Sequence, residues 1–282
     1  MGGVDSLWDE LDDRLLPLLR RYRRNLAELR VDTKPDSTLL SEADLAAQTL
    51  IVDAIERRFP GSGFVAEEDH SGFPLSGEPL WIIDPIDGTS EFVAAEGREF
   101  CSVICRVEAG IPTAAYILAP ELGVDRSVLT IRWADTVTVN GRSAVPISAA
   151  SRPRRASITR SKGSAPREFE KALAVVGSET KIRTTSQTLD MVRTCIDLSP
   201  LTEIAQWFDL FYRPNQKVWD GAAGIGLCLA MGRAAVDGFG DEVVPIDSDL
   251  LQQRQPIFAE TVAGSPECVR WFTDVLAQSR GG

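Results

Sequence analysis

The stretch WIIDPIDGTSEF, residues 81–92, leads a run of apolar residues directly into two carboxylates. The apolar run predicts a short buried strand over 80–83, and Asp84 and Asp87 follow it three positions apart. No lysine or arginine follows these acids before Arg98. Two carboxylates this close repel each other unless a proton or a cation lies between them. The sequence therefore predicts a divalent cation at the end of this strand.

The residues around the two acids suit such a site. Pro85 restricts its own backbone and lacks an N–H, which leaves the Ile86 carbonyl free to point inward. Gly88 permits a close approach of another group, and Thr89 opens the next segment with free backbone N–H groups that can bind an anion. The alternative interpretation of a bare Asp-Pro-x-Asp pattern is a turn in which an Asp or a Thr caps a helix.

Three other acids could join this pair. Glu67 follows an apolar step within VAEEDHS, and Asp220 begins a helix within VWDGAAG. Taken alone, Glu67 would belong to a solvated acidic turn, and Asp220 would be a helix N-cap. Asp44 would pair with Ser41 in a capping box. Carboxylate and carbonyl ligands favour hard ions, so the ion expected here is Mg²⁺ or Mn²⁺ rather than zinc.

The composition narrows the classes of function. The chain has 282 residues and a net charge of −11, which argues against a general nucleic-acid or membrane-surface binder. A small anionic substrate stays compatible, because a bound metal reverses the local sign of charge. The single histidine, His70, cannot form a histidine-rich metal site. Five scattered cysteines without CxxC spacing indicate free thiols in a reducing compartment, and with an acidic N-terminus this predicts a cytoplasmic protein.

The chain mixes predicted helices and strands from end to end. Helices are expected over 5–29, 41–61, 167–177, 188–196, 219–232 and 266–278. Further strands are expected over 99–110, 111–119, 156–160, 207–213, 234–239 and 256–264, and a hairpin over 135–148 with Asn140-Gly141 at its tip. A change of composition near residue 150 predicts two halves, 1–150 and 151–282. The expected fold class is α/β or α+β, with sheets layered between helices.

The three acidic motifs together resemble the inositol monophosphatase superfamily. They are VAEED, DPIDGT and, about 130 residues later, WDGAAG. The segment KPDSTLLSEAD is similar to the Lys…Thr-x-x-Asp segment of that family, with Ser41 in place of the threonine. The resemblance spans residues from about 30 to 262. It implies a layered α-β-α-β-α sandwich of the inositol monophosphatase and fructose bisphosphatase type, Mg²⁺-dependent hydrolysis of phosphate monoesters, and a homodimer.

The resemblance also implies a ligand set for the metal. Glu67, Asp84 and the Ile86 carbonyl would bind one ion, and Asp84, Asp87 and Asp220 would bind a second. With a possible third, weaker ion, the cofactor would be two or three Mg²⁺ ions, for which Mn²⁺ could substitute. Two such ions can clamp the attacking and leaving oxygens of a phosphoryl transfer and lower the pKa of the attacking water.

The catalytic roles follow from the same resemblance. Glu67 and Thr89 would orient and help to deprotonate the attacking water, and Asp44 would support the weaker ion through Thr89 or a water. The N–H groups of Gly88 and Thr89 would hold the phosphate. The substrate-binding residues expected are Gly88, Thr89, Ser90, Ser186, Arg213 and Lys217.

The branch of the family decides the expected substrate. FDLFYRP resembles the Asp-Leu-Tyr-Pro-Arg segment of the bisphosphate nucleotidases, although its Tyr and Pro are changed and Ser90 stands where they have lysine. Arg213 and Lys217 could meet a second phosphate or a base, or be an ordinary exposed basic pair. The substrate expected is a nucleotide, such as a 3'(2'),5'-bisphosphate or a nucleoside monophosphate. The alternatives are an inositol monophosphatase, a sugar phosphatase or a histidinol phosphatase.

Two departures from the family pattern could reshape the substrate pocket. Residues 120–136 are short where the family has a longer hairpin, and residues 196–208 look like an insertion. A rival class is a degenerate relative that binds a nucleotide or metal without turnover, but the intact set of acids argues for catalysis. A dinucleotide site at GAAGIG, residues 221–226, lacks the GxGxxG spacing, and its glycines instead suggest close helix packing.

Overall fold

The strands of this computed structural model form three sheets, and the structure describes residues 3–35, 38–68, 78–160, 163–183, 185–204 and 206–280. The smallest sheet pairs β1 (Val31–Thr33) with β2 (Leu39–Ser41). The largest runs in the order β3 (Gly63–Ala66), β4 (Leu80–Asp87), β5 (Cys101–Glu108), β6 (Ile111–Ala119), β7 (Leu129–Trp133), β8 (Val137–Val139) and β9 (Arg142–Ser143). The third runs in the order β11 (Glu179–Lys181), β10 (Arg155–Ser157), β12 (Leu210–Lys217), β14 (Ile257–Gly264) and β13 (Ala234–Val236).

The α-helices of the described chain separate and cover these sheets. They are α1 (Val4–Arg24), α2 (Glu42–Arg58), α3 (Thr89–Val93), α4 (Glu168–Val175), α5 (Gln187–Cys195), α6 (Val218–Ala230), α7 (Ser248–Leu251) and α8 (Pro266–Arg280). Within the described ranges, short 3₁₀ turns occupy Leu26–Glu28, Val124–Arg126 and Ser199–Leu201. No helix among the described residues is both long enough and apolar enough to cross a membrane.

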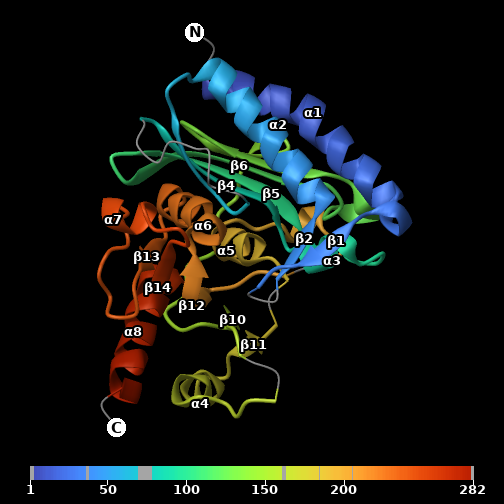
Figure 1. Cartoon of the computed structure of the whole chain (residues 1–282). Coiled ribbons are helices and arrows are strands. Elements are labelled where there is room, and N and C mark those ends of the chain that lie inside the picture. The colour runs from blue at the N-terminus through green and yellow to red at the C-terminus, as the bar shows by residue number, and fades with distance from the viewer. Residues whose placement is uncertain are drawn as a thin grey trace.

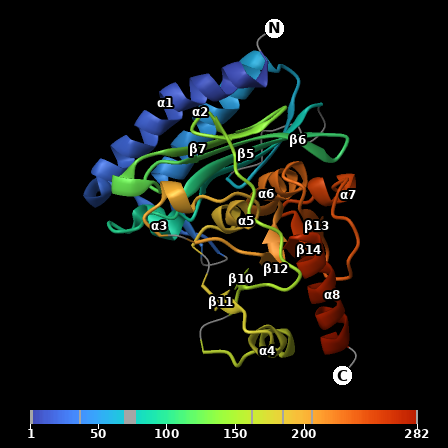
Figure 2. The same ribbon diagram turned by 180° about the vertical axis from the view of Figure 1, so that it is seen from behind.

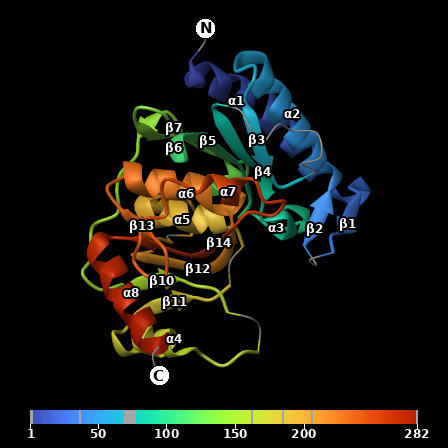
Figure 3. The ribbon, with the colours of Figure 1, turned by 60° about the vertical axis from the view of Figure 1, so that its left-hand side comes forward.

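The elements stack in five layers, as the family resemblance implies. Helices α1 and α2 cover the outer face of the large sheet, and α5 and α6 lie between the two larger sheets (Figure 1). Helices α4 and α8 cover the far face of the second sheet, which the reverse view in Figure 2 also shows. The side view in Figure 3 separates α5 and α6 from both sheets and places α3 beside the small β1–β2 sheet. The predicted α-β-α-β-α sandwich is therefore confirmed.

Strand β4 shows why an uninterrupted apolar run leads to the acids. Alternate side chains along a strand point to opposite faces. Trp81 and Ile83 lie in the core under α1 and α2, whereas Leu80 and Ile82 lie in the core against α5 and α6. Because helices cover both faces of the sheet here, every residue of the strand is buried.

The close packing of α5 against α6 depends on glycine, as the sequence predicts for GAAGIG. A Cβ atom at Gly224 would lie 2.7 Å from the Cβ of Met191 on α5. This is closer than two carbon atoms approach without a shift of the backbone. This contact lies midway along both helices, and the Thr188 hydroxyl joins their first turns by donating to the Asp220 carbonyl.

Most of the predicted elements are confirmed, with shifted ends. The first helix stops at Arg24, and Leu26 lies in the following 3₁₀ turn. Pro17 lies inside this helix, which continues through it. The short strands β1, β2, β3, β7 and β11 and the short helices α3 and α7 are absent from the sequence prediction.

The two departures from the family pattern lie against each other. Residues 120–136 carry β7, and residues 196–208, described except for 205, carry a 3₁₀ turn. An isolated bridge joins Gly123 to Thr202. The division near residue 150 stays a prediction: each large sheet draws on one half of the chain, but the core between them draws on both.

Candidate metal and phosphate site

The site begins where β4 loses its regular pairing. Strand β4 pairs with the antiparallel β5, and the register shifts between Asp84 and Asp87. On its other side β4 runs parallel to β3, so the two carboxyl ends lie together, and the Glu67 N–H donates to the Ile83 carbonyl at 3.0 Å. The register therefore brings the acid after β3 next to the acids at the end of β4.

Gly88 ends the strand in a conformation that other residues avoid. Its φ is +91°, and a Cβ atom there would lie 2.8 Å from the Glu99 carbonyl oxygen and 3.0 Å from that of Thr185. Only glycine fits without a shift of the backbone on either side. The turn delivers Thr89 to the start of α3, beside the acids.

Three carboxylates converge at this turn. Asp84, Asp87 and Asp220 each offer one oxygen, and these atoms all lie within 4.8 Å of one another. They share a cavity of about 320 Å³. Its lining residues are Thr38, Leu39, Glu67, Asp84, Ile86, Asp87, Gly88, Thr89, Ser90 and Asp220.

The electrostatics of these carboxylates favour a bound cation. Burial raises the pKa of Asp84 well above its usual range, and the charges of Glu67 and Asp87 raise it further. Burial and the charge of Asp87 do the same to the pKa of Asp220. The Asp84 Oδ1 atom is buried without a hydrogen-bond partner among the described residues. A hard divalent ion would pair with this oxygen and relieve the repulsion, so the donor set fits Mg²⁺ or Mn²⁺.

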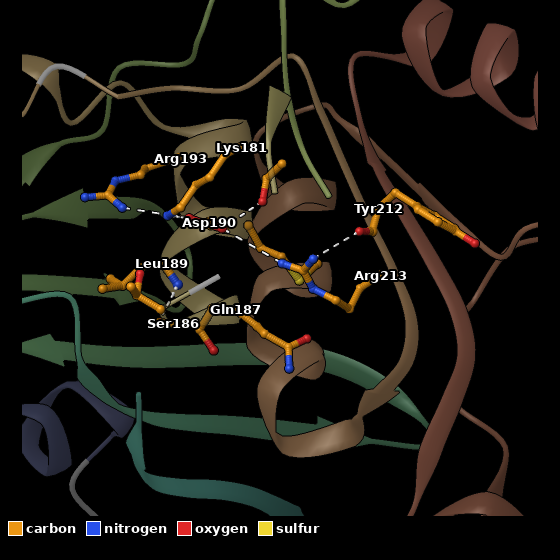
Figure 4. A network of polar contacts seen from close by, with 12 residues as sticks. Lys181, Ser186, Gln187, Leu189, Asp190, Arg193, Tyr212 and Arg213 are labelled. Atoms are coloured by element: carbon orange, nitrogen blue, oxygen red, sulfur yellow. Dashed lines mark hydrogen bonds and ion pairs between the residues drawn. The ribbon is translucent and has the colours of Figure 1, made fainter. Parts of the chain in front are cut away.

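Asp87 is held by the first turn of α5. The Ser186 hydroxyl and the Thr188 N–H each donate to its Oδ2 atom at 2.7 Å, and the Gln187 N–H donates to Oδ1 at 3.3 Å. Burial still raises the pKa of Asp87, while these hydrogen bonds lower it. Ser186, which the sequence analysis assigns to the substrate, is buried beneath this acid and also caps α5 through the Leu189 N–H (Figure 4). Ser186 thus supports Asp87 and is outside the lining of the cavity, and its substrate role stays a prediction.

Asp220 lies in the first turn of α6 and has a partner that the sequence analysis does not include. The Gln187 Nε2 atom donates to Asp220 Oδ2 at 2.5 Å. The Thr188 hydroxyl donates to the main-chain carbonyl of Asp220 at 3.0 Å. The sequence Ser186-Gln187-Thr188 is typical of a helix N-terminus, which is the one local sign of this contact. No local pattern shows that this helix start faces Asp220.

Glu67 is paired with a lysine from the first strand region. The Lys34 Nζ atom lies 2.8 Å from Glu67 Oε1 and 2.6 Å from Glu68 Oε1. Burial lowers the pKa of Lys34, but the two glutamates outweigh burial and raise it above its usual range. Gln48 holds the main chain of Glu68 through two hydrogen bonds, of 2.7 and 3.1 Å. Lys34 is the lysine of the KPDSTLLSEAD segment, and it orients the Glu67 carboxylate.

Asp44 caps α2 and also contacts Thr89. Its Oδ2 atom accepts hydrogen bonds from the N–H and the hydroxyl of Ser41, at 2.8 and 2.6 Å, which confirms the capping box. Its Oδ1 atom lies 3.4 Å from the Thr89 hydroxyl, which also lies 3.1 Å from the Ile86 carbonyl. Burial, partly offset by the Ser41 hydrogen bonds, raises the pKa of Asp44 to about 6.

The two predicted cations differ in access. The Arg213 side chain is only 4% exposed, lies 3.9 Å from Asp190 Oδ2, and is outside the lining of the cavity (Figure 4). Burial lowers the pKa of Arg213 to about 10. Lys217 is half-buried, donates to Gln255 at 2.9 Å, and lowers the pKa of the nearby Asp220. A substrate role for both stays a prediction, and Lys217 is the more accessible of the two.

The buried acids make a testable prediction about pH. Burial raises the pKa of Glu68 to about 7 and that of Asp44 to about 6, above their usual values of 4.5 and 3.8. A carboxylic acid whose folded-state pKa is raised stabilises the fold at low pH, and that contribution is lost as the pH rises through the folded-state value. The melting temperature of metal-free protein in EDTA should therefore fall as the pH rises from about 4 to 7. Each kcal/mol of folding free energy that is lost should lower it by about 2–4 °C.

Glu68→Gln provides the control for this titration, because it removes one of the acids whose pKa is raised and should reduce the fall. Excess Mg²⁺ should also offset the fall, because the ion binds the ionised carboxylates of Asp84, Asp87 and Asp220 and so stabilises the fold more as the pH rises. A melting temperature that rises with pH in EDTA would contradict the assignment.

The chain resembles a known protein family along most of its length. The model of the inositol monophosphatase family matches residues 9–269. The chain is 29% identical over 214 residues to the 3'(2'),5'-bisphosphate nucleotidase CysQ of Escherichia coli K12, which covers 74% of this chain and 80% of that protein. It is 26% identical over 273 residues to the Nus factor SuhB of Xylella fastidiosa, a match that covers 94% of this chain and 91% of that protein. A match at 34% identity to the histidinol-phosphatase of Mycobacterium tuberculosis spans only half of each chain.

Solved structures show the same fold. The suppressor protein SuhB of Bartonella henselae covers 98% of both chains with a TM-score of 0.74 and 20% identity. An IMPase/NADP phosphatase complexed with NADP and Ca²⁺ covers 96% of this chain and 94% of that one, with a TM-score of 0.74 and 17% identity. The family match over residues 9–269 shows that the chain belongs to the inositol monophosphatase family, a family of metal-dependent phosphatases.

Proposed function

We propose that this chain hydrolyses a small phosphomonoester with the help of Mg²⁺, and that its substrate is a nucleotide such as a 3'(2'),5'-bisphosphate or a nucleoside monophosphate. The convergence of Asp84, Asp87 and Asp220 within 4.8 Å, in a cavity that Glu67 and Thr89 also line, carries this proposal. A phosphate needs its charge neutralised and a water activated in line with the leaving oxygen. The cavity combines groups suited to both tasks.

The ions, when bound, would neutralise charge on the phosphate and lower the pKa of the attacking water. Glu67, held by Lys34, presents a carboxylate that can accept a proton from that water. The Thr89 hydroxyl can donate to Asp44 or to the Ile86 carbonyl, which leaves its oxygen free to accept from the same water and orient it. The backbone N–H groups of Gly88 and Thr89 are the proposed phosphate seat.

Two observations support a nucleotide as the substrate. The match to CysQ covers three quarters of this chain, which is more than the match to histidinol-phosphatase covers. Lys217, half-buried beside Asp220, is a cation that a second phosphate could reach. Histidinol phosphate is the second candidate, because the identity over the shared half is higher, at 34%. Inositol and sugar phosphates are further candidates, and a relative that binds without turnover is the rival class.

The remaining properties implied by the family belong to the same proposal. They are two or three Mg²⁺ ions with Mn²⁺ as a substitute, a homodimer, and a cytoplasmic location. The location is supported by the five cysteines, which are all buried and free of disulfide bonds. The number of ions is supported by the additional acids, Glu67 and Asp44, that lie around the three converging aspartates.

A phosphate-release screen tests the proposed function. Purified protein with Mg²⁺ should release phosphate from at least one compound among nucleoside monophosphates, 3'(2'),5'-bisphosphates, histidinol phosphate, inositol phosphates and sugar phosphates. EDTA should abolish this release, and Mg²⁺ should restore it. The substrate proposal predicts a higher kcat/KM for a nucleotide than for the other classes. Full activity in excess EDTA would contradict the metal dependence, and a preference for inositol or sugar phosphates would contradict the nucleotide assignment alone.

A further inference from the structure

Gln187 contacts two of the three converging acids at once. It is the first residue of α5. Its backbone N–H donates to Asp87 at 3.3 Å, and its side-chain Nε2 donates to Asp220 at 2.5 Å. The side chain therefore joins the acid at the end of β4 to the acid at the start of α6.

The chemistry of the amide fixes its orientation. The Nε2 atom donates to Asp220, so the oxygen faces away from it. A bound cation would keep Asp220 ionised, and an ionised carboxylate only accepts hydrogen bonds, so the same orientation would hold with the metal present. That oxygen, Gln187 Oε1, is buried and has no hydrogen-bond partner among the described residues. A buried acceptor without a partner marks a place for a water or a ligand. Mg²⁺ in protein sites usually keeps several waters, which are donors of the kind that this oxygen lacks.

Polar contacts hold helix α5, which carries this side chain, in place. One turn after Gln187, the fully buried Asp190 accepts from Lys181 and from Ser157, both at 2.7 Å. Figure 4 shows Asp190 between Lys181 and Arg213, with Gln187 on the same helix facing α6. The Thr188 hydroxyl joins the start of α5 to the main chain of α6. Because the helix is held in place, the Gln187 side chain can hold the Asp220 carboxylate in one orientation.

We propose that Gln187 is a positioning residue for the metal: by holding the Asp220 carboxylate, it sets the affinity for a hard divalent ion bound by Asp84, Asp87 and Asp220. This inference rests on the metal-dependent part of the proposed function. Hydrogen-bond partners of metal ligands typically account for a factor of about 10–100 in metal affinity. The expected effect is therefore on ion binding rather than on the chemical step.

Gln187→Met tests the proposal, because methionine keeps the length of the side chain and removes both the donor and the acceptor. Isothermal titration of metal-stripped protein with MgCl₂ should give a Kd about 10–100-fold above that of the wild type. The Mg²⁺ concentration for half-maximal turnover should rise by a similar factor, with kcat restored at saturating Mg²⁺. Gln187→Asn, whose amide is one methylene shorter than that of glutamine, should weaken Mg²⁺ binding in the same way if the methionine variant fails to fold.

Gln216→Met is the matched control. Gln216 is a glutamine whose amide oxygen is likewise buried without a partner among the described residues, but its nitrogen contacts the Met191 sulfur at 3.4 Å instead of an acid. This variant should bind Mg²⁺ like the wild type. Equal Mg²⁺ affinity in Gln187→Met and the wild type would overturn the inference, as would equal weakening in both methionine variants. Failure of the wild type itself to bind Mg²⁺ would overturn the metal-dependent function together with the inference.

Discussion

Asp84→Asn should abolish most of the phosphatase activity and at the same time make the metal-free protein more stable to heat than the wild type. The ion would lose its most buried ligand. A bound metal stabilises the charge of the transition state by several kcal/mol. Losing this stabilisation should lower turnover by about 10²–10⁴-fold. Without a metal, however, Asp84 is a buried carboxyl whose Oδ1 atom has no partner and whose pKa the neighbouring Glu67 and Asp87 help to raise. An uncharged amide ends that repulsion and can donate to the neighbouring carboxylates.

The measurement combines kcat in Mg²⁺ with melting temperatures at pH 8, in EDTA and in excess Mg²⁺. Of the conditions named here, pH 8 drives the acids most strongly to ionise. The melting temperature of Asp84→Asn in EDTA should therefore exceed that of the wild type by several degrees, since each kcal/mol of folding free energy corresponds to about 2–4 °C. The stabilisation that Mg²⁺ gives to the wild type should be lost in the variant. A metal-free Asp84→Asn protein that melts below the wild type would show that the carboxylate is stabilising without the ion.

Asp87→Asn also removes a charged metal ligand, but unlike Asp84→Asn it should not make the metal-free protein more stable. The Asp87 carboxylate faces the hydroxyl of Ser186 and the N–H groups of Gln187 and Thr188. An asparagine there would turn its own N–H group toward at least one of these donors, so no gain in metal-free stability is expected. Its activity should fall and recover in part at high Mg²⁺, because only one charged ligand is lost. Equal stabilisation by both asparagine variants would contradict this difference between the two acids.

The features that the sequence predicts correctly have local causes. The apolar run before Asp84 indicates a strand buried on both faces, and β4 is such a strand. The spacing of Ser41 and Asp44 indicates a capping box, which begins α2. Glycines in GAAGIG indicate close helix packing, and Gly224 meets Met191. Each inference starts from residues within one short stretch of sequence, where periodicity, capping chemistry and side-chain size indicate the local structure.

The features that the sequence does not predict are contacts between distant elements. Lys34 pairs with Glu67, and Ser186 donates to Asp87 across a separation of 99 residues. The second contact depends on where α5 begins relative to β4, which no local pattern specifies. The sequence also does not show that Ser186 and Arg213 face buried acids, Asp87 and Asp190, because no local pattern tells which group a hydroxyl or a guanidinium meets in the fold. Their substrate roles stay predictions.

The short strands also escape sequence analysis for a physical reason. Strands β1, β2 and β11 have three residues each, too few for an alternating pattern to be seen. They exist because a partner strand supplies the hydrogen bonds, as β2 does for β1. Strand β1 nevertheless matters for the site, because Lys34 follows it directly.

Glu67→Gln should lower turnover by about 10²-fold or more, the size of a general-base contribution. Glutamine keeps an oxygen that can accept from Lys34, which lies 2.8 Å from Glu67 Oε1, so the geometry around the residue should persist. What is lost is the carboxylate that lines the cavity beside Asp84. Turnover is measured at several Mg²⁺ concentrations: a residue that acts only as a metal ligand should be rescued by excess Mg²⁺, whereas the loss of a base should persist at saturation.

Glu68→Gln is the matched control in the adjacent position. Glu68 contacts the same lysine, at 2.6 Å, but it lies outside the residues that line the cavity, and Gln48 fixes its main chain. The same chemical change should therefore leave turnover within about threefold of the wild type, because it removes a neighbouring charge without touching the water. Wild-type turnover in Glu67→Gln would move the base to another group, and Thr89 with Asp44, at 3.4 Å, would then be the pair to change next.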